Sequence, residues 1–92
     1  MSTLFEDVEN YYERPVKAKV IERLAGTDLT ESEAGDVLCV ALNHLPPKYI
    51  QCRVALSFYM TSTDKAQMDK AMDQAVEQAL HQVSANRAYR AD

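Results

Sequence analysis

The residues best suited to bind an anion lie in one segment of this chain. His44, Lys48 and Arg53 fall within the 27 residues from Val37 to Thr63, which contain no Asp or Glu. Residues 1–36 are the opposite, because nine acids and four bases give them a net charge of −5. Cationic side chains without neighbouring carboxylates are suited to binding phosphate or carboxylate groups. The sequence therefore predicts an anion site in the middle segment.

Patterns for catalysis or for metal binding are missing from the sequence. There is no Ser-His-Asp or Cys-His arrangement with a known signature, and there is no glycine-rich phosphate loop. Cys39 and Cys52 have neither CxxC spacing nor a nearby histidine pair. Two isolated cysteines fit a reduced, cytoplasmic protein. We expect no catalytic residues, no metal and no cofactor.

Length and charge narrow the class of protein. A chain of 92 residues has room for one small domain, residues 1–92, whose thin core a partner subunit would help to cover. A net charge of −4 disfavours extensive binding to a nucleic-acid backbone. The N-terminus has no apolar signal region, and no apolar run is long enough to cross a membrane. We expect a cytoplasmic protein without nucleic-acid or membrane partners.

Apolar residues that recur every four positions predict a first helix ending near Leu24. A capping-box pattern at Thr3 and Glu6 opens it. Pro15 lies inside this stripe, so the helix is expected to kink or restart there, with Arg14 pushed out of helical geometry. Gly26 is the expected C-terminal cap.

Two further helices follow from the same signals. A capping box at Thr30 and Glu33 opens a second helix that the pair Pro46-Pro47 ends. The last helix is expected to run from the Thr61–Asp64 cap to about residue 85, and residues 86–92 are predicted to form a flexible tail. The fold class is therefore mostly α, a small domain of three to four helices.

Residues 54–60 are ambiguous between strand and helix. Apolar residues alternate there as in a strand, but a run this short also fits a helix. A lone strand is not stable, so a strand here would pair with its copy in a homodimer.

Two sequence elements resemble those of a known family. The first is N-x-x-E-x-x-V at Asn10 to Val16, and the second is A-L-N-x-L-P-P-x-Y at Ala41 to Tyr49, with Asp36 between them. From about residue 8 to residue 83 the chain resembles the ComFB family of late competence development proteins. The resemblance implies a mostly helical, dimeric, cytoplasmic bacterial protein without catalytic activity. Some cyanobacterial members are receptors for cyclic di-GMP.

This chain departs from one branch of that family. The founding type, in spore-forming bacteria, has a cysteine cluster suited to zinc just before the A-L-N element. Around Asp36 this chain has Gly35 and Val37, with only Cys39 nearby. We therefore expect no structural zinc, and the branch of cyclic di-GMP receptors is the better comparison.

Cyclic di-GMP, the ligand that this comparison implies, offers two phosphates and two guanine faces. A receptor needs cations for the phosphates, flat groups for stacking and polar groups for the guanine edges. The candidates are Arg53, Lys48 and His44 for phosphate, Tyr49 and Tyr12 for stacking, Asn43 and Glu13 for base edges, and Arg14 and Lys17 from the first helix. The ligand is two-fold symmetric, so a site across a dimer interface would suit it.

Most of these residues also have a structural interpretation. Arg53 could pair with an acid from elsewhere in the fold, and Asn43 could bond to backbone near its helix end. Tyr49 could be a core tyrosine with its hydroxyl at the surface. Glu13 could pair with Lys17 one turn along the helix.

Two functions of different classes fit the sequence. The first is a signalling protein that binds cyclic di-GMP and relays it to a protein partner. The second is a ligand-free helical dimer that acts as a protein–protein adaptor in competence or motility, with tyrosines as contacts. A DNA-binding regulator fits less well, because no helix is rich in Arg or Lys.

Overall fold

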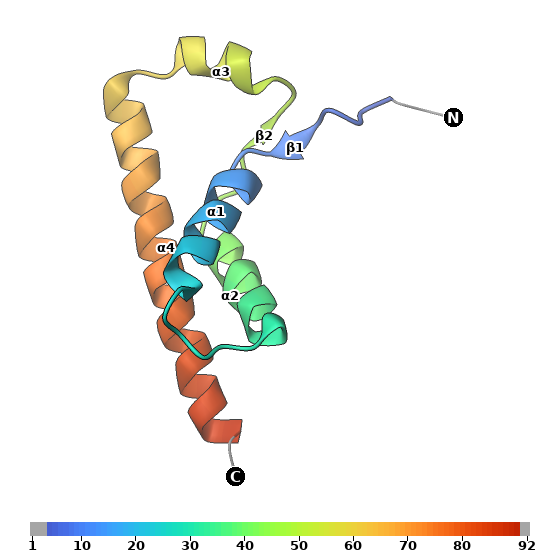
Figure 1. Cartoon of the computed structure of the whole chain (residues 1–92). Coiled ribbons are helices and arrows are strands. Elements are labelled where there is room, and N and C mark those ends of the chain that lie inside the picture. Colours follow the sequence, from blue (N-terminus) through green and yellow to red (C-terminus); the bar gives the residue numbers. More distant parts are fainter. Residues whose placement is uncertain (1–3, 91–92) are drawn as a thin grey trace.

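The protein is a mostly helical domain, as the sequence predicts. The computed structural model describes residues 4–90, and the surroundings of side chains as far as Arg87. The elements are β1 (Glu9–Asn10), α1 (Glu13–Leu24), α2 (Glu31–Asn43), β2 (Tyr49–Ile50), α3 (Arg53–Tyr59) and α4 (Ser62–Arg90). Helices α1 and α2 pack against the long α4, while α3 leads from β2 into the start of α4 (Figure 1).

The core lies where α1, α2 and α4 meet. All three helices contribute small or branched apolar residues, which let the helix backbones come close. The buried residues are Tyr12, Val16, Val20, Val37, Ala41, Leu45, Met72, Ala75, Val76, Ala79 and Val83. Ion pairs along the α1–α4 seam join Lys19 to Asp69 and Asp73, at 2.8 Å each, and Arg23 to Glu77. These pairs are exposed and stabilise the seam only weakly, so apolar burial dominates.

The first helix begins later than its hydrophobic stripe predicts. Residues 4–7 form a turn and Glu9–Asn10 form a strand, so the predicted helix over this stretch is wrong. The predicted cap at Thr3 lies outside the described residues. Pro15 is the third residue of α1, a position whose amide has no helical acceptor, so the helix begins just before the proline instead of kinking or restarting at it. Arg14 is helical, contrary to expectation, because a first-turn position tolerates a following proline.

The second helix and the turn before it form as predicted. Thr30 and Glu33 make a reciprocal capping box, and α2 ends before the double proline. Gly26 adopts φ 84°, the left-handed conformation that favours glycine after a helix. The last helix extends to Arg90, five residues past its predicted end, and the remainder of the expected tail lies outside the described residues.

The ambiguous segment is a helix, α3, so a cross-chain strand through residues 54–60 is not formed. Helix α3 has seven residues and contributes none to the core. Its exposed fractions are 67% for Val54, 82% for Phe58 and 84% for Tyr59. A helix this short gains little from its own hydrogen bonds, so its stability depends on neighbouring contacts.

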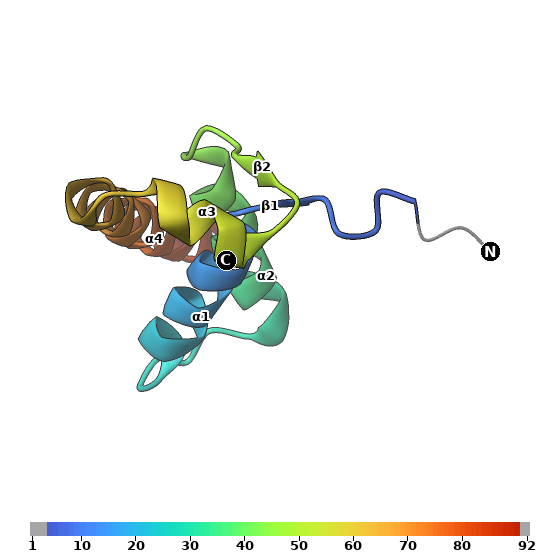
Figure 2. The same cartoon turned by 90° about the horizontal axis from the view of Figure 1, so that it is seen from above.

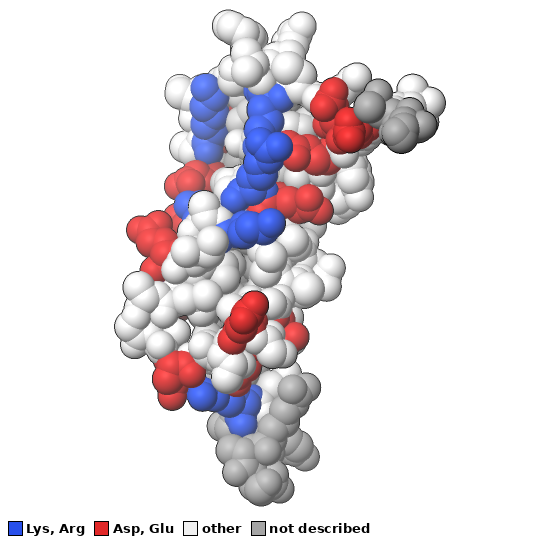
Figure 3. All heavy atoms as spheres, turned by 45° about the vertical axis from the view of Figure 1, so that its right-hand side comes forward, with Lys and Arg blue, Asp and Glu red and all other residues white. Residues whose placement is uncertain are grey.

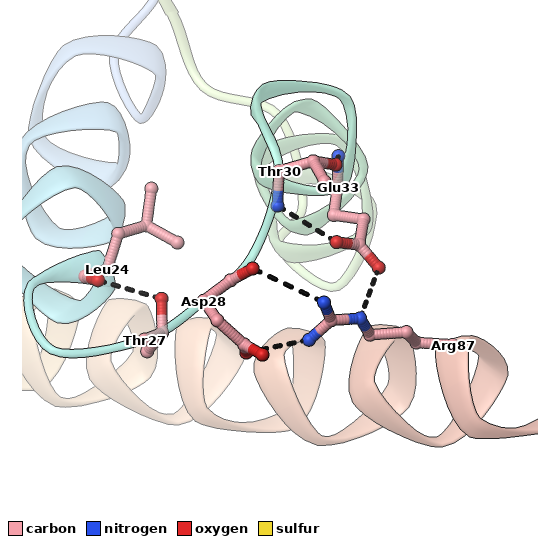
Figure 4. A network of polar contacts seen from close by, with 6 residues as sticks. All are labelled: Leu24, Thr27, Asp28, Thr30, Glu33 and Arg87. Atoms are coloured by element: carbon pink, nitrogen blue, oxygen red, sulfur yellow. Dashed lines mark hydrogen bonds and ion pairs between the residues drawn. The ribbon is translucent and has the colours of Figure 1, made fainter. Parts of the chain in front are cut away.

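Arg87 on α4 forms ion pairs and hydrogen bonds with residues of the turn between α1 and α2 and of the first turn of α2 (Figure 4). Its guanidinium donates to the Asp28 carboxylate at 2.7 Å and to the Asp28 carbonyl at 3.3 Å, and it lies 3.1 Å from Glu33. Glu33 also accepts from the Thr30 amide in the capping box, so one carboxylate joins the helix cap to α4.

Low pH should destabilise this fold, because it protonates carboxylates that are paired with basic groups or amides in the folded state. Arg87 lowers the pKa of Asp28 and Arg23 lowers the pKa of Glu77, while the Thr61 amide lowers the pKa of Asp64. Because the folded pKa values lie below the unfolded ones, this stabilisation is complete above about pH 4 to 5 and disappears as the pH falls through the folded values.

We expect the thermal midpoint, followed by circular dichroism, to fall steeply only in this acidic range. In Arg87→Gln the fall should be shallower, since Asp28 has lost its partner. An unchanged midpoint from neutral pH to about pH 3 would contradict this expectation.

Candidate functional site

A short ribbon joins the two sequence elements that predict the family. Strands β1 and β2 pair antiparallel, with Asn10 opposite Tyr49. The Asn10 side-chain oxygen accepts from the Lys48 amide at 3.0 Å and from the Tyr12 amide at 3.3 Å. The Tyr11 amide donates to the Lys48 carbonyl at 2.6 Å. Asn10 therefore fixes the segment after the double proline to the start of α1.

Arg53 pairs with an acid from elsewhere in the fold, which is the structural role that the sequence analysis left open. Its Nε donates to Glu9 at 2.9 Å and its Nη2 donates to the Tyr11 carbonyl at 2.9 Å. The guanidinium also lies 4.9 Å from the centre of the Tyr11 ring. Arg14 approaches the other oxygen of Glu9 at 3.4 Å. Arg53 thus ties the start of α3 to β1, and only part of its charge remains for a ligand.

The cleft beside Arg53 does not favour an anion. It has a volume of about 230 Å³, and Arg14 and Arg53 line it together with Glu6, Asp7 and Glu9. Three carboxylates face two guanidinium groups there, so a phosphate would be repelled. Figure 3 shows basic side chains in a band on the upper half of one face, with acidic groups at its edges.

A second hollow lies between the ribbon, α3 and the first turns of α4. Its volume is about 340 Å³, within the range of small-molecule sites. Its lining residues are Lys48, Leu56, Tyr59, Met60, Asp64, Gln67 and Met68. It combines an apolar wall with one cation, one aromatic ring, one carboxylate and one amide. Among these residues the sequence predicts only Lys48 as a ligand contact, because Tyr59, Asp64 and Gln67 lie on helices whose packing the sequence does not reveal.

A third cleft, larger than these two, lies toward the other end of the molecule, between α2 and α4. It measures about 510 Å³ and contains Cys39 and Val83 among its lining residues. Its one cation, Arg87, is already paired with Asp28 and Glu33. None of the predicted ligand-binding residues lines it.

The structure separates the predicted ligand-binding residues. Tyr12 is only 7% exposed, and its ring packs in the core rather than against a ligand. Burial raises the pKa of its hydroxyl, with a smaller contribution from Tyr11. Lys48 lines the hollow, whereas Arg14 and Arg53 line the acidic cleft.

The remaining predicted residues lie at the surface. Tyr49 is 70% exposed, so it is not a core tyrosine. Four more are exposed and make no hydrogen bond or ion pair through their side chains within the part of the chain that the structure describes. They are Glu13, Lys17, Asn43 and His44. The ion pair suggested between Glu13 and Lys17 is therefore not formed.

The family elements are mainly architectural. Val16 and Ala41 are fully buried, Leu45 is 7% exposed, and Asn10 holds the ribbon. The family model of the late competence development protein ComFB matches residues 9–87. The chain belongs to the ComFB family. This membership fits a role related to competence. Comparison with curated proteins and with solved structures found no match.

This ComFB chain has three further features. No helix among the described residues has both the length and the apolar character needed to cross a membrane. Among residues 4–90, no three or more His, Cys, Asp or Glu side chains are grouped so that they could hold a metal ion. Cys39 and Cys52 are both exposed, free thiols.

The two family asparagines provide a matched pair for testing the ribbon. Asn10→Ala leaves the Lys48 and Tyr12 amides without their acceptor, and we expect a loss of about 1–3 kcal/mol in the free energy of unfolding. Asn43→Ala removes an exposed side chain and should change the free energy of unfolding by less than about 0.5 kcal/mol. Urea denaturation measures both, and equal effects would show that Asn10 does not hold the ribbon.

Arg53 and Arg14 provide a second matched pair, since both contact Glu9. Arg53→Ala removes two hydrogen bonds and a ring contact, and we expect it to cost about 1–3 kcal/mol of unfolding free energy. The Arg14 side chain is 71% exposed, so Arg14→Ala should cost less than about 1 kcal/mol. If Arg53→Ala left stability unchanged in urea denaturation, its contacts with Glu9 and Tyr11 would not be what stabilises this end of the fold.

Proposed function

We propose that this ComFB protein binds cyclic di-GMP and relays the bound state to a protein partner. The observation that supports this most directly is the hollow beside the A-L-N-x-L-P-P-x-Y element, where Lys48, Tyr59 and Gln67 surround one space. Family membership supports a role in competence, and it does not by itself specify a ligand.

The lining of the hollow suits a guanine nucleotide. The Lys48 ammonium supplies a charge for phosphate, and the Tyr59 ring offers a face on which a base can stack. A guanine edge carries N–H donors, which the Asp64 carboxylate or the Gln67 carbonyl could accept. One oxygen of Asp64 already accepts from the Thr61 amide at 3.0 Å, so its other oxygen is the candidate acceptor.

The hollow alone is small for a whole dinucleotide. Its volume of about 340 Å³ lies near the lower limit for small-molecule sites. A two-fold symmetric ligand could place each half in the hollow of one chain, so the proposal includes a homodimer. The exposed Tyr49 and the basic side of α1, with Arg14 and Lys17, are further surfaces that could contact the ligand outside the hollow.

Isothermal titration calorimetry with cyclic di-GMP tests the proposal, with cyclic di-AMP and GTP as controls. We expect saturable heat for cyclic di-GMP alone. One ligand per two chains would support a ligand that spans both hollows, and one ligand per chain would contradict that arrangement. Lys48→Ala should weaken binding about tenfold or more, because a charge-assisted contact to phosphate is lost. Lys70→Ala is the matched control, since Lys70 is exposed on α4 and lines none of these three cavities.

The results of these titrations distinguish whether the protein binds the nucleotide at all from where on its surface the nucleotide binds. Binding that is insensitive to Lys48 but lost in an Arg14 and Lys17 double variant would move the site to the outer face of α1. No heat with any nucleotide, on a protein shown to be folded, would refute the receptor proposal.

The ligand-free adaptor is the second candidate, and the exposure of α3 favours it. Phe58 and Tyr59 are each more than four-fifths exposed, which is unusual for aromatic side chains unless another surface covers them. A ligand that binds only the folded state must raise the melting temperature. A melt that no cyclic dinucleotide shifts would favour the adaptor.

A further inference from the structure

The cleft between α2 and α4 lies apart from the hollow that the proposed function uses. Its volume is about 510 Å³, and all of its lining residues come from these two helices. Helix α1 packs against both helices and contributes no lining residue (Figure 2). Asp36, Cys39 and Asn86 in the lining are exposed, so the cleft is an open groove and not a closed cavity. Grooves between helices are surfaces on which amphipathic helices of partner proteins dock.

The bottom of the groove is apolar. Val83 is only 6% exposed and belongs to the core, and the half-buried Val40 packs against that core. On α2 the lining residues run from Glu33 to Val40, which is a length of about 10 Å along the helix axis. This length corresponds to two helical turns. The groove therefore has room for two apolar side chains that stand one turn apart on a docked helix.

The rim of the groove is acidic. Residues 27–40 contain four acids and no base. Arg87 is the one cation among the lining residues, and its guanidinium is already paired with Asp28 and Glu33 (Figure 4). Asp36 makes no ion pair and no side-chain hydrogen bond within the part of the chain that the structure describes. Its negative charge is therefore available to a cation from outside the chain.

This combination of an apolar bottom and an acidic rim selects the occupant. A segment with apolar side chains on one face and basic side chains beside them is complementary to both parts. Nucleic acids and anionic lipid surfaces carry the same sign of charge as the rim, so they are repelled. A second copy that met this groove by two-fold symmetry would bring two acidic rims together, which is also unfavourable.

We propose that the groove between α2 and α4 binds a basic amphipathic helix of a different protein. Apolar side chains one turn apart on that helix pack on Val40 and Val83, and a lysine or arginine pairs with Asp36. Asn86 lies in the same lining and makes no side-chain hydrogen bond among the described residues, so its amide is available to the bound helix. This site goes beyond the proposed function, because it lies toward the other end of the molecule and needs no nucleotide.

Fluorescence anisotropy with a labelled peptide is the first experiment, and it uses the full chain. The probe is a designed amphipathic peptide of leucine, alanine and lysine, long enough for about four helical turns. We expect saturable binding with a Kd in the micromolar range. A peptide of the same composition, reordered so that it has no apolar face, should bind about tenfold more weakly or worse, because only charge attraction remains.

The two free cysteines provide a matched pair for locating the peptide. Both are exposed, but only Cys39 lines this groove, while Cys52 lines the acidic cleft beside Arg53. Alkylation of Cys39 with N-ethylmaleimide in a Cys52→Ser background places a bulky group in the groove and should weaken binding about tenfold or more. Alkylation of Cys52 in a Cys39→Ser background should leave the affinity unchanged.

Two exposed carboxylates test the role of charge. Neither Asp36 nor Glu22 makes an ion pair among the described residues, and Glu22 lies on α1, outside the groove. Asp36→Lys should weaken peptide binding about tenfold or more, whereas Glu22→Lys should change it less than about twofold. Circular dichroism should show unchanged helical content in both variants, since neither side chain is buried.

Each contrary result overturns the inference. No binding to a folded protein refutes the docking site, and binding that ignores alkylation of Cys39 places the peptide elsewhere. Equal affinity for the reordered peptide, or equal effects of Asp36→Lys and Glu22→Lys, would mean charge attraction without a groove. A dimer in sedimentation velocity that dissociates on alkylation of Cys39 would make a second copy the occupant. If the peptide binds while cyclic di-GMP gives no heat, only the nucleotide proposal fails.

Discussion

Pro15 has no amide proton to donate to the Tyr11 carbonyl, and this missing hydrogen bond shapes the end of the molecule where the candidate site lies. Helix α1 begins at Glu13, and the first helical bond runs from the Val16 amide to the Tyr12 carbonyl at 3.0 Å. The Tyr11 carbonyl is then free to accept from Arg53. Residues 9 and 10 are free to pair with β2. Because of Pro15, the apolar stripe does not form one continuous helix. Its first part forms β1, which pairs with β2, and the Tyr11 carbonyl binds Arg53 at the start of α3.

The sequence predicts what depends on local chemistry. The capping box at Thr30, the stop at the double proline and the turn at Gly26 each involve neighbouring residues, and each is observed. The inward faces of α2 and α4 follow from the 3.6-residue period. What the sequence did not predict is the ribbon, because pairing of Asn10 with Tyr49 joins positions 39 apart and leaves no periodic signal in two-residue strands.

The candidate site was predicted only in part for the same reason. Lys48 and Arg53 are predicted as ligand contacts because they lie in a segment without acidic residues. The charge of Arg53 is nevertheless largely neutralised by Glu9. Tyr59, Asp64 and Gln67 carry no local signature of a site. They meet Lys48 only because α3 carries the chain from β2 to the start of α4. The hollow forms only when separate segments of the chain come together in the fold, and its lining residues form no recognisable sequence motif.

Helix α3 is the element on which both candidate functions, receptor and adaptor, depend. Leu56 and Tyr59 line the hollow, whereas Phe58 is exposed at the surface. Because α3 contributes nothing to the core, contacts on either face would stabilise it. A nucleotide in the hollow would hold α3 in one position and so favour a protein partner that binds α3, and by thermodynamic linkage that partner would raise the affinity for the nucleotide by the same factor. A marginal helix between two binding surfaces is thus a simple physical means by which a small protein could pass the presence of a ligand to a protein partner.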